Sequence, residues 1–224
     1  MSTNRKIIFA NGEYYHVFNR GVEKRLTFTG KYEFLRAIDA INFYRFGNLP
    51  FRYSKYLALN QEKRVDFLKS LNEVELQVEI IAFCLMGNHF HLLVKQLKDG
   101  GIVKFMAKFT NSYTKYFNTK HNRVGPLFQG VFKAVRIEDD EQLLHLSRYI
   151  HLNPIAGFIV KPEELKSYKW SSYPEYLGII NARTTNIKDV LSFFKSTDEY
   201  EDFVLDQADY SMKLKTIEHL AIDL

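Results

Sequence analysis

The chain has 224 residues, a formal net charge of +5 and one cysteine, and 46% of its residues are hydrophobic. This length and composition indicate one globular domain with a sizeable core. A lone cysteine excludes a disulfide framework and a cysteine metal cluster. The chain starts without a signal-peptide core, and no apolar run approaches the ~20 residues of a membrane span. A soluble cytoplasmic protein without membrane contact is the expectation.

Charge is distributed unevenly along the chain. Residues 104–136 contain seven Lys or Arg and no Asp or Glu, whereas residues 186–209 contain seven acidic residues and two lysines. A basic segment of this kind suits a phosphate backbone, although a solvated helix face would produce the same pattern. The acidic segment has two interpretations as well: a solvated helix, or a cover over the basic region.

The first third of the chain predicts a strand followed by helices. Residues 13–21, EYYHVFNRG, are aromatic and β-branched and end at a turn sequence. Residues 31–46 repeat apolar side chains at helical spacing, and Gly47 and Pro50 end that helix. A further helix is expected over residues 54–71.

The middle of the chain predicts a hairpin, a helix and a last strand. Two strand-like runs, LQVEIIAFCLM and HFHLLVKQ, are joined by Gly87-Asn88, which is a hairpin signal. Residues 102–118 predict an amphipathic helix, and LFQGVFKAVRI predicts a fourth strand, interrupted by Gly130. The order strand, helix, two strands, helix, strand is that of the ferredoxin-like split βαββαβ, an α+β fold with an antiparallel sheet.

A further helix follows the fourth strand. Asp139 and Asp140 can cap its start. Its end is expected near Asn153, because Pro154 disfavours helical backbone at the residue before it.

Two histidines, His89 and His91, occupy alternate positions of the predicted strand HFHLLVKQ. Strand alternation points both to one face of the sheet and Phe90, Leu92 and Val94 to the other. Two imidazoles placed in this way can bind one divalent metal ion. The pattern alone is weak, because such pairs are also common as structural residues. A third ligand and a reacting group are therefore needed from elsewhere.

The segment RYIHLNP supplies both kinds of group. Tyr149 and Asn153 are four residues apart and share a helix face. Asn153 offers a carbonyl oxygen as a hard ligand, and Tyr149 offers a phenol, with an ordinary pKa of ~10, that a neighbouring cation could activate. The alternative is a buried tyrosine beside a helix-ending asparagine. Tyr113 and Tyr116 lie on an apolar helix stripe, where core packing explains them.

These segments together resemble the single-tyrosine HUH transposase family, in its REP-associated tyrosine transposase branch. The resemblance rests on GNHFHLLV, RYIHLNPIAGFI and WSSYPEYLG, with YYHVFNRG and GPLFQGVFKA in support. It covers roughly residues 12–178. It implies the split βαββαβ fold and a catalytic domain in residues 1–180, with residues 181–224 as an acidic helical extension.

The resemblance also implies a reaction. His89 and His91 are the expected metal ligands, Asn153 is the third ligand, and Tyr149 is the nucleophile that forms a 5′-phosphotyrosine link. The metal is Mg²⁺ or Mn²⁺. The expected enzyme nicks single-stranded, hairpin-containing DNA and transfers the strand, as a monomer or a homodimer.

Basic residues and two further histidines complete the expected site. Phosphate contacts carry affinity rather than sequence readout. Arg148, next to the nucleophile, could clamp a phosphate or pair with Asp140 instead. His145 and His16 are candidate accessory residues. The expected DNA contacts are Arg20, Lys104, Lys108, Lys115, Arg123, Lys133, Arg136 and Arg148.

Two other functions fit the same residues. A metal-dependent phosphodiesterase would use water in place of Tyr149 and would form no covalent intermediate. A non-cleaving protein derived from a transposase would hold structured DNA, and its hairpin binding would survive the loss of His89.

Overall fold

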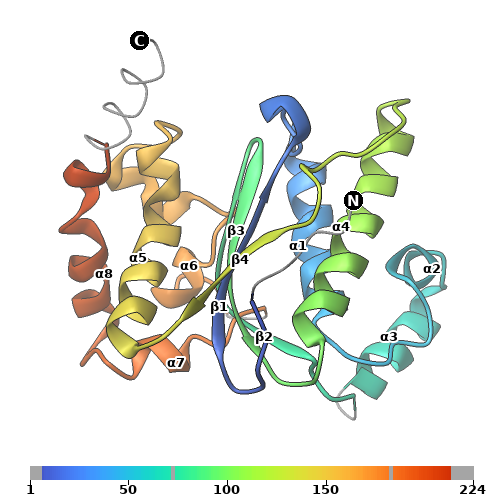
Figure 1. The fold of residues 1–224 in the computed structure, drawn as a ribbon, viewed down its shortest axis with the longest axis horizontal. Coiled ribbons are helices and arrows are strands. Elements are labelled where there is room, and N and C mark those ends of the chain that lie inside the picture. The colour runs from blue at the N-terminus through green and yellow to red at the C-terminus, as the bar shows by residue number, and fades with distance from the viewer. Residues whose placement is uncertain (1–6, 72–73, 182–183, 213–224) are drawn as a thin grey trace.

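The fold is built around a four-stranded antiparallel sheet with helices on both faces (Figure 1). The computed structural model describes residues 7–71, 74–181 and 184–212. The sheet order is β2-β3-β1-β4, and its strands are β1 (Tyr14–Arg20), β2 (Val78–Met86), β3 (His89–Gln96) and β4 (Lys133–Ile137). A 3-10 turn, η1 (Val22–Lys24), follows β1. With α1 (Lys31–Tyr44) before β2 and α4 (Gly101–Lys120) before β4, the connectivity is the split βαββαβ predicted from the sequence.

The face covered by α1 and α4 carries an extensive aromatic core. Phe90 of β3 points into it and meets the Phe109 ring of α4 edge-on at 5.4 Å. Tyr113 is fully buried here and donates to the Thr27 carbonyl oxygen at 2.6 Å. Burial of each such ring contributes about 1.5–3 kcal/mol. Tyr113 is therefore a core residue, as its position on the apolar stripe predicted.

A helical insertion lies beyond α1 on this side of the sheet. The single helix expected over residues 54–71 is divided into α2 (Tyr53–Leu57) and α3 (Gln61–Ser70). The division falls at Asn60, whose backbone is extended rather than helical. Its side-chain oxygen caps α3 by accepting a hydrogen bond from the Lys63 amide at 2.9 Å. Because an N-cap residue has non-helical backbone, the cap at Asn60 separates α3 from α2.

The opposite face of the sheet is covered by the helices that follow β4. These are α5 (Asp140–Ala156), η3 (Pro162–Ser167), α6 (Tyr173–Tyr176), α7 (Lys188–Leu191) and α8 (Thr197–Leu205). Leu93 of β3, Ile150 of α5 and Val204 of α8 belong to this second core. The described part of the acidic segment is therefore packed on α5, on the side of the sheet away from α2 and α4 (Figure 1).

A buried polar network joins α5 to its neighbours. His151 is fully buried, and its Nδ1 lies 2.8 Å from the Tyr200 hydroxyl of α8. Its Nε2 lies 2.8 Å from the hydroxyl of Ser172, which contacts the backbone of β2 at Phe83. The Tyr200 hydroxyl also donates to Ser147 at 3.2 Å. Fully satisfied buried networks of this kind rigidify the elements they connect.

Two element boundaries differ from the predictions. The helix expected to end near Asn153 continues through Pro154 to Ala156, because burial of Ile155 in the core offsets the backbone hydrogen bond that proline cannot donate. The fourth strand begins only at Lys133, because Gly130 adopts a positive φ of 58° that interrupts the ladder after the isolated pairing of Phe128 with Gly21. The predicted cap at Asp139 is confirmed, since its Oδ1 accepts from the Gln142 amide at 2.8 Å.

Within the described residues, no helix combines the length and the apolar character needed to cross a bilayer.

Candidate active site

The two histidines of β3 lie in the middle of the sheet, on the face that α5 covers. In the register between β1 and β3, Arg20 is opposite His89 and Phe18 is opposite His91. His91 is 7% exposed, whereas Phe90 between the two histidines points into the other core. The predicted alternation is confirmed, so both imidazoles belong to one face.

Each imidazole holds a hydrogen bond at Nδ1. His89 Nδ1 lies 2.6 Å from Asn88 Oδ1, and His89 donates because that oxygen only accepts. His91 Nδ1 lies 2.9 Å from Nε2 of His16 on β1. Burial lowers the pKa of His16 to about 4, so its ring is neutral near neutral pH. A neutral imidazole that donates through Nδ1 carries its lone pair on Nε2, and metal-binding histidines commonly have such an outer partner.

Helix α5 places a tyrosine and an asparagine over these rings. The Tyr149 side chain is 45% exposed and meets the His91 ring edge-on, with ring centroids 5.5 Å apart. It meets the His16 ring edge-on at 6.1 Å. One turn later Asn153 is buried, and its Nδ2 donates to the Tyr149 carbonyl oxygen at 2.8 Å. That bond orients the carboxamide, and Oδ1 is the atom that would bind a metal ion.

One cavity of ≈ 320 Å³ is lined by His89, His91, Tyr149 and Asn153 together. Arg20 and Lys133 contribute positive charge to it, and no Asp or Glu is among its described lining residues. A cavity with this charge suits a phosphate group and offers no carboxylate to activate water. Its lining residues are Phe18, Asn19, Arg20, Met86, His89, Phe90, His91, Gln129, Lys133, Tyr149, Asn153 and Gly157.

The donors around this cavity fit a divalent metal ion. No three His, Cys, Asp or Glu side chains form a metal-binding group in the described ranges, so a site here would need a carboxamide oxygen, such as that of Asn153, as third donor. Carbonyl oxygen suits Mg²⁺ and Mn²⁺, and imidazole nitrogen suits transition metals. His89, His91 and Asn153 carry no net charge as ligands, so a bound cation would keep its full attraction for phosphate oxygens.

Arg148 and His145 lie away from the cavity. The Arg148 guanidinium stacks 4.2 Å from the Phe203 ring centroid of α8 and donates to the Phe203 carbonyl oxygen at 3.3 Å. Its Nη2 lies 2.5 Å from Nδ1 of His145, whose Nε2 faces Glu141 at 3.5 Å. Arg148 therefore contacts α8, and among the described residues it forms no ion pair with Asp140.

The other basic candidates divide into three groups. Arg20 and Lys133 line the cavity, and Lys108 and Lys115 line a groove on the opposite side of the sheet. The remaining three are engaged elsewhere: Lys104 donates to the Asp99 carbonyl oxygen, Arg123 donates to Asn118 and Pro126, and Arg136 pairs with Glu13.

Sequence reasoning missed Asn19 and Gln129, which also line the cavity. Asn19 is buried, and its Oδ1 accepts from the Arg20 amide at 2.8 Å. The Gln129 amide donates to the Arg20 carbonyl oxygen at 2.8 Å, which brings the segment before β4 to the end of β1. Both residues lie in segments that carried the resemblance, YYHVFNRG and GPLFQGVFKA, and a polar residue at the end of a buried strand was the available signal.

Comparison with known proteins agrees with this geometry. Residues 52–153 match the family model described as transposase IS200 like, and this span contains both histidines, Tyr149 and Asn153. The fold is similar to that of a REP-associated tyrosine transposase solved bound to a REP hairpin, with a TM-score of 0.51 and 16% sequence identity. The similarity covers 80% of this chain and 86% of that one. No curated protein sequence matches the chain significantly. Residues 52–153 are therefore similar in sequence to IS200-like transposases, and the chain shares its fold with a REP-associated tyrosine transposase.

Proposed function

We propose that the chain cleaves single-stranded DNA by attack of the Tyr149 phenol on a backbone phosphate, and that it rejoins strands from the resulting 5′-phosphotyrosine. The observation that carries the proposal is the single cavity in which Tyr149 and Asn153 of α5 meet His89 and His91 of β3. The exposure of the phenol beside a buried imidazole distinguishes Tyr149 from the core tyrosines.

The residues of the cavity have separate roles in this reaction. A divalent ion held by His89, His91 and Asn153 would polarise the scissile phosphate as a Lewis acid. Arg20 and Lys133 bind phosphate oxygens and orient the strand for in-line attack.

Bond making and bond breaking balance at the phosphorus. The Tyr149 oxygen forms a bond to phosphorus while the bond to the 3′ oxygen breaks. The phenol loses one proton, and the leaving 3′ oxygen gains one. Because the number of phosphate ester bonds is unchanged, a later 3′-hydroxyl can reverse the step without ATP. The outcome is strand transfer rather than hydrolysis.

We further propose that the DNA contains a hairpin and that one protomer suffices. The structurally similar transposase was solved with a REP hairpin, which supports a structured substrate. Tyr149 lies against the histidine of its own chain, so the cavity has its nucleophile and its ligands without a second copy.

The decisive experiment is covalent capture. The full-length protein is incubated with Mn²⁺ and hairpin-containing oligonucleotides labelled at the 3′ end, since that fragment keeps the phosphotyrosine. We expect a labelled protein band on a denaturing gel. Tyr149→Phe should abolish the band, and Tyr210→Phe, which removes an exposed hydroxyl elsewhere, should preserve it.

Two outcomes would contradict the proposal. Cleavage without any covalent band would identify a phosphodiesterase that uses water. Hairpin binding that persists in His89→Ala, with no cleavage under Mg²⁺ or Mn²⁺, would identify a binding protein.

A further inference from the structure

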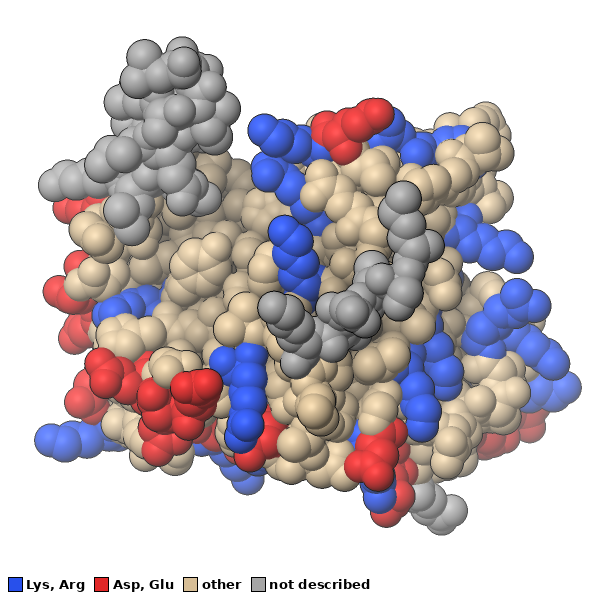
Figure 2. Space-filling view, in the orientation of Figure 1, with Lys and Arg blue, Asp and Glu red and all other residues tan. Residues whose placement is uncertain are grey.

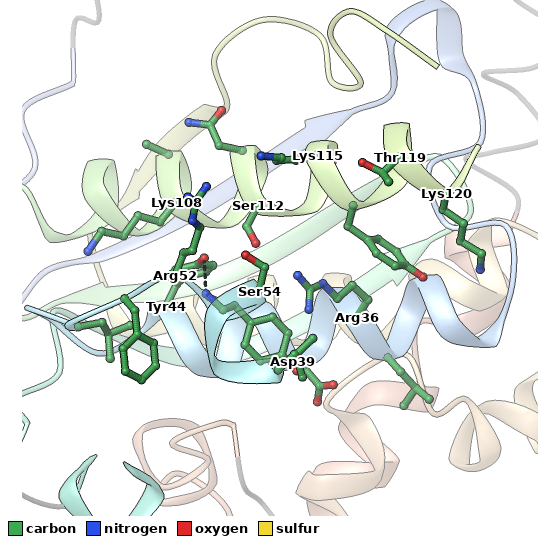
Figure 3. Close-up of a pocket in the computed structure, with 18 of the residues that line it drawn as sticks. Arg36, Asp39, Tyr44, Arg52, Ser54, Lys108, Ser112, Lys115, Thr119 and Lys120 are labelled. Carbon is green, nitrogen blue, oxygen red and sulfur yellow. Dashed lines mark hydrogen bonds between the residues drawn. The ribbon is translucent and has the colours of Figure 1, made fainter. Parts of the chain in front are cut away.

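A second cavity lies on the other side of the sheet from the candidate nucleophile. It is an open groove of ≈ 1140 Å³ between α1, α4 and the segment around α2 (Figure 3). The sheet separates α1 and α4 from α5 (Figure 1). The groove therefore shares no lining residue with the active-site cavity.

Positive charge dominates the groove. Its walls contain five basic side chains and one carboxylate, Asp39. Of the five, only Lys120 forms an ion pair within the described ranges, to Glu33 at 2.7 Å. Figure 2 shows Lys and Arg along the half of the molecule that contains α2 and α4, whereas Asp and Glu gather towards α8. The basic lining residues are Arg36, Arg52, Lys108, Lys115 and Lys120.

Helix α4 presents a polar row to the groove. Lys108 and Lys115 are two turns apart, which corresponds to about 10 Å along the helix axis. Ser112 lies between them and Thr119 follows, so hydroxyl donors alternate with the ammonium groups (Figure 3). Such a row can follow a chain of phosphates.

Aromatic rings line a further part of the groove. The Arg36 guanidinium lies 4.2 Å from the Tyr53 ring centroid and 5.3 Å from the Tyr116 ring centroid. Its Nε is buried and has no hydrogen-bond partner in the part of the chain that the structure describes. Tyr32 at the margin is 71% exposed. Tyr32 also lies beside a cation, since Lys120 Nζ is 5.6 Å from its ring centroid. An exposed tyrosine ring next to basic side chains provides a stacking platform for a base.

We propose that this groove binds unpaired nucleotides, and that it forms a second nucleic-acid site remote from the cleavage cavity. Phosphates lie on the Lys108–Lys115 row, and a base stacks on the exposed ring of Tyr32. A concave groove between helices admits single bases, whereas the paired bases of a double helix cannot turn out to meet this ring. That the strand is the enzyme's own DNA substrate rests on the proposed function; the preference for unpaired nucleotides rests on the groove alone.

Binding is measured with the full-length protein, without divalent metal so that no cleavage occurs. The probe is a fluorescein-labelled oligothymidine, followed by fluorescence anisotropy over a range of salt concentrations. Lys108→Ala/Lys115→Ala should reduce the affinity at least about tenfold at low salt, and should lower the salt slope by about 1.4, since each phosphate on a single strand contributes ~0.7. The matched control, Lys63→Ala/Lys69→Ala on α3 outside the groove, should change neither.

A second variant tests stacking. Tyr32→Ala should reduce the affinity about 5- to 150-fold with an unchanged salt slope, because a base–aromatic contact contributes about 1–3 kcal/mol. Tyr210→Ala, also an exposed tyrosine but outside the groove, is its control.

Wild-type affinity and slope in the lysine variant would overturn the proposal. Equal competition by blunt duplex DNA or by polyglutamate would also overturn it, because neither presents unpaired bases. Covalent capture at Tyr149 reports on the proposed function separately. A protein that forms no adduct but shows groove-dependent binding contradicts the mechanism and leaves the groove assignment intact.

Discussion

The contact between His16 and His91 gives a sharp test of the metal site. If His91 binds metal through Nε2, its Nδ1 must donate, and Nε2 of His16 is the acceptor at 2.9 Å. His16→Phe keeps an aromatic ring in β1 and removes that acceptor. His16→Gln offers a carbonyl oxygen in its place.

The geometry sets the expected magnitude. Loss of the outer partner of a metal-bound histidine costs about 10–100-fold in metal affinity, or about 1.4–2.7 kcal/mol. Since His91 is only 7% exposed, water cannot readily replace the lost acceptor. We therefore expect His16→Phe to lower the metal affinity by close to a hundredfold. Folding stability should fall by only about 1 kcal/mol, the net contribution of one hydrogen bond.

Mn²⁺ titration of the full-length protein, followed by the electron paramagnetic resonance of free Mn²⁺, measures the affinity. Urea unfolding without metal measures stability separately. His16→Gln should recover much of the affinity, and His145→Phe should bind as wild type because His145 lies outside the cavity. Wild-type affinity in His16→Phe would refute the tautomer argument, since His91 would then not depend on this acceptor.

Three further outcomes are expected. Asn153→Ala should weaken Mn²⁺ binding at least about tenfold in the same titration. An unchanged affinity would show that Asn153 is no metal ligand and only forms its hydrogen bond to the Tyr149 backbone. Burial lowers the pKa of His151 to about 3, below its ordinary 6.5, so the unfolded state binds more protons between these values. His151 should therefore contribute a fall in unfolding free energy of about 1.4 kcal/mol per pH unit below pH 6.5 in urea titrations, beside the contribution of His16, whose pKa is also lowered. A profile as steep in His151→Gln as in the wild type would contradict a neutral buried imidazole at this position. Finally, a mixture of Tyr149→Phe and His91→Ala proteins should form no covalent adduct, because each chain contains its own site; an adduct would show that two chains share one.

Local periodicity was enough to predict much of the fold. The turn at Gly87-Asn88 and the alternation of β3 follow from period-two spacing, and the helical positions of Tyr149 and Asn153 follow from a spacing of four. The core position of Tyr113 follows from the stripe on its helix. Each of these features depends on residues close together in the chain.

Features that depend on distant residues could not be predicted in this way. His16 meets His91 because β1 is inserted beside β3, and the direction of Arg148 depends on Phe203 more than fifty positions away. Pro154 is tolerated because α5 is packed on β2. The spacing of residues along the chain does not report these tertiary contacts, and the contacts override local conformational preference.

The hydrogen-bond network around His151 links the C-terminal helix α8 to the helix that contains Tyr149. α8 and the loop at Ser172 both form hydrogen bonds to His151, on the same helix as Tyr149, so α8 helps to fix the position of the candidate nucleophile. A chain shortened before α8 would keep every candidate ligand and the Tyr149 phenol, but it would lose the packing contacts that position α5. Any minimal catalytic fragment must therefore extend through Leu205 rather than stop where the sheet and α5 are complete.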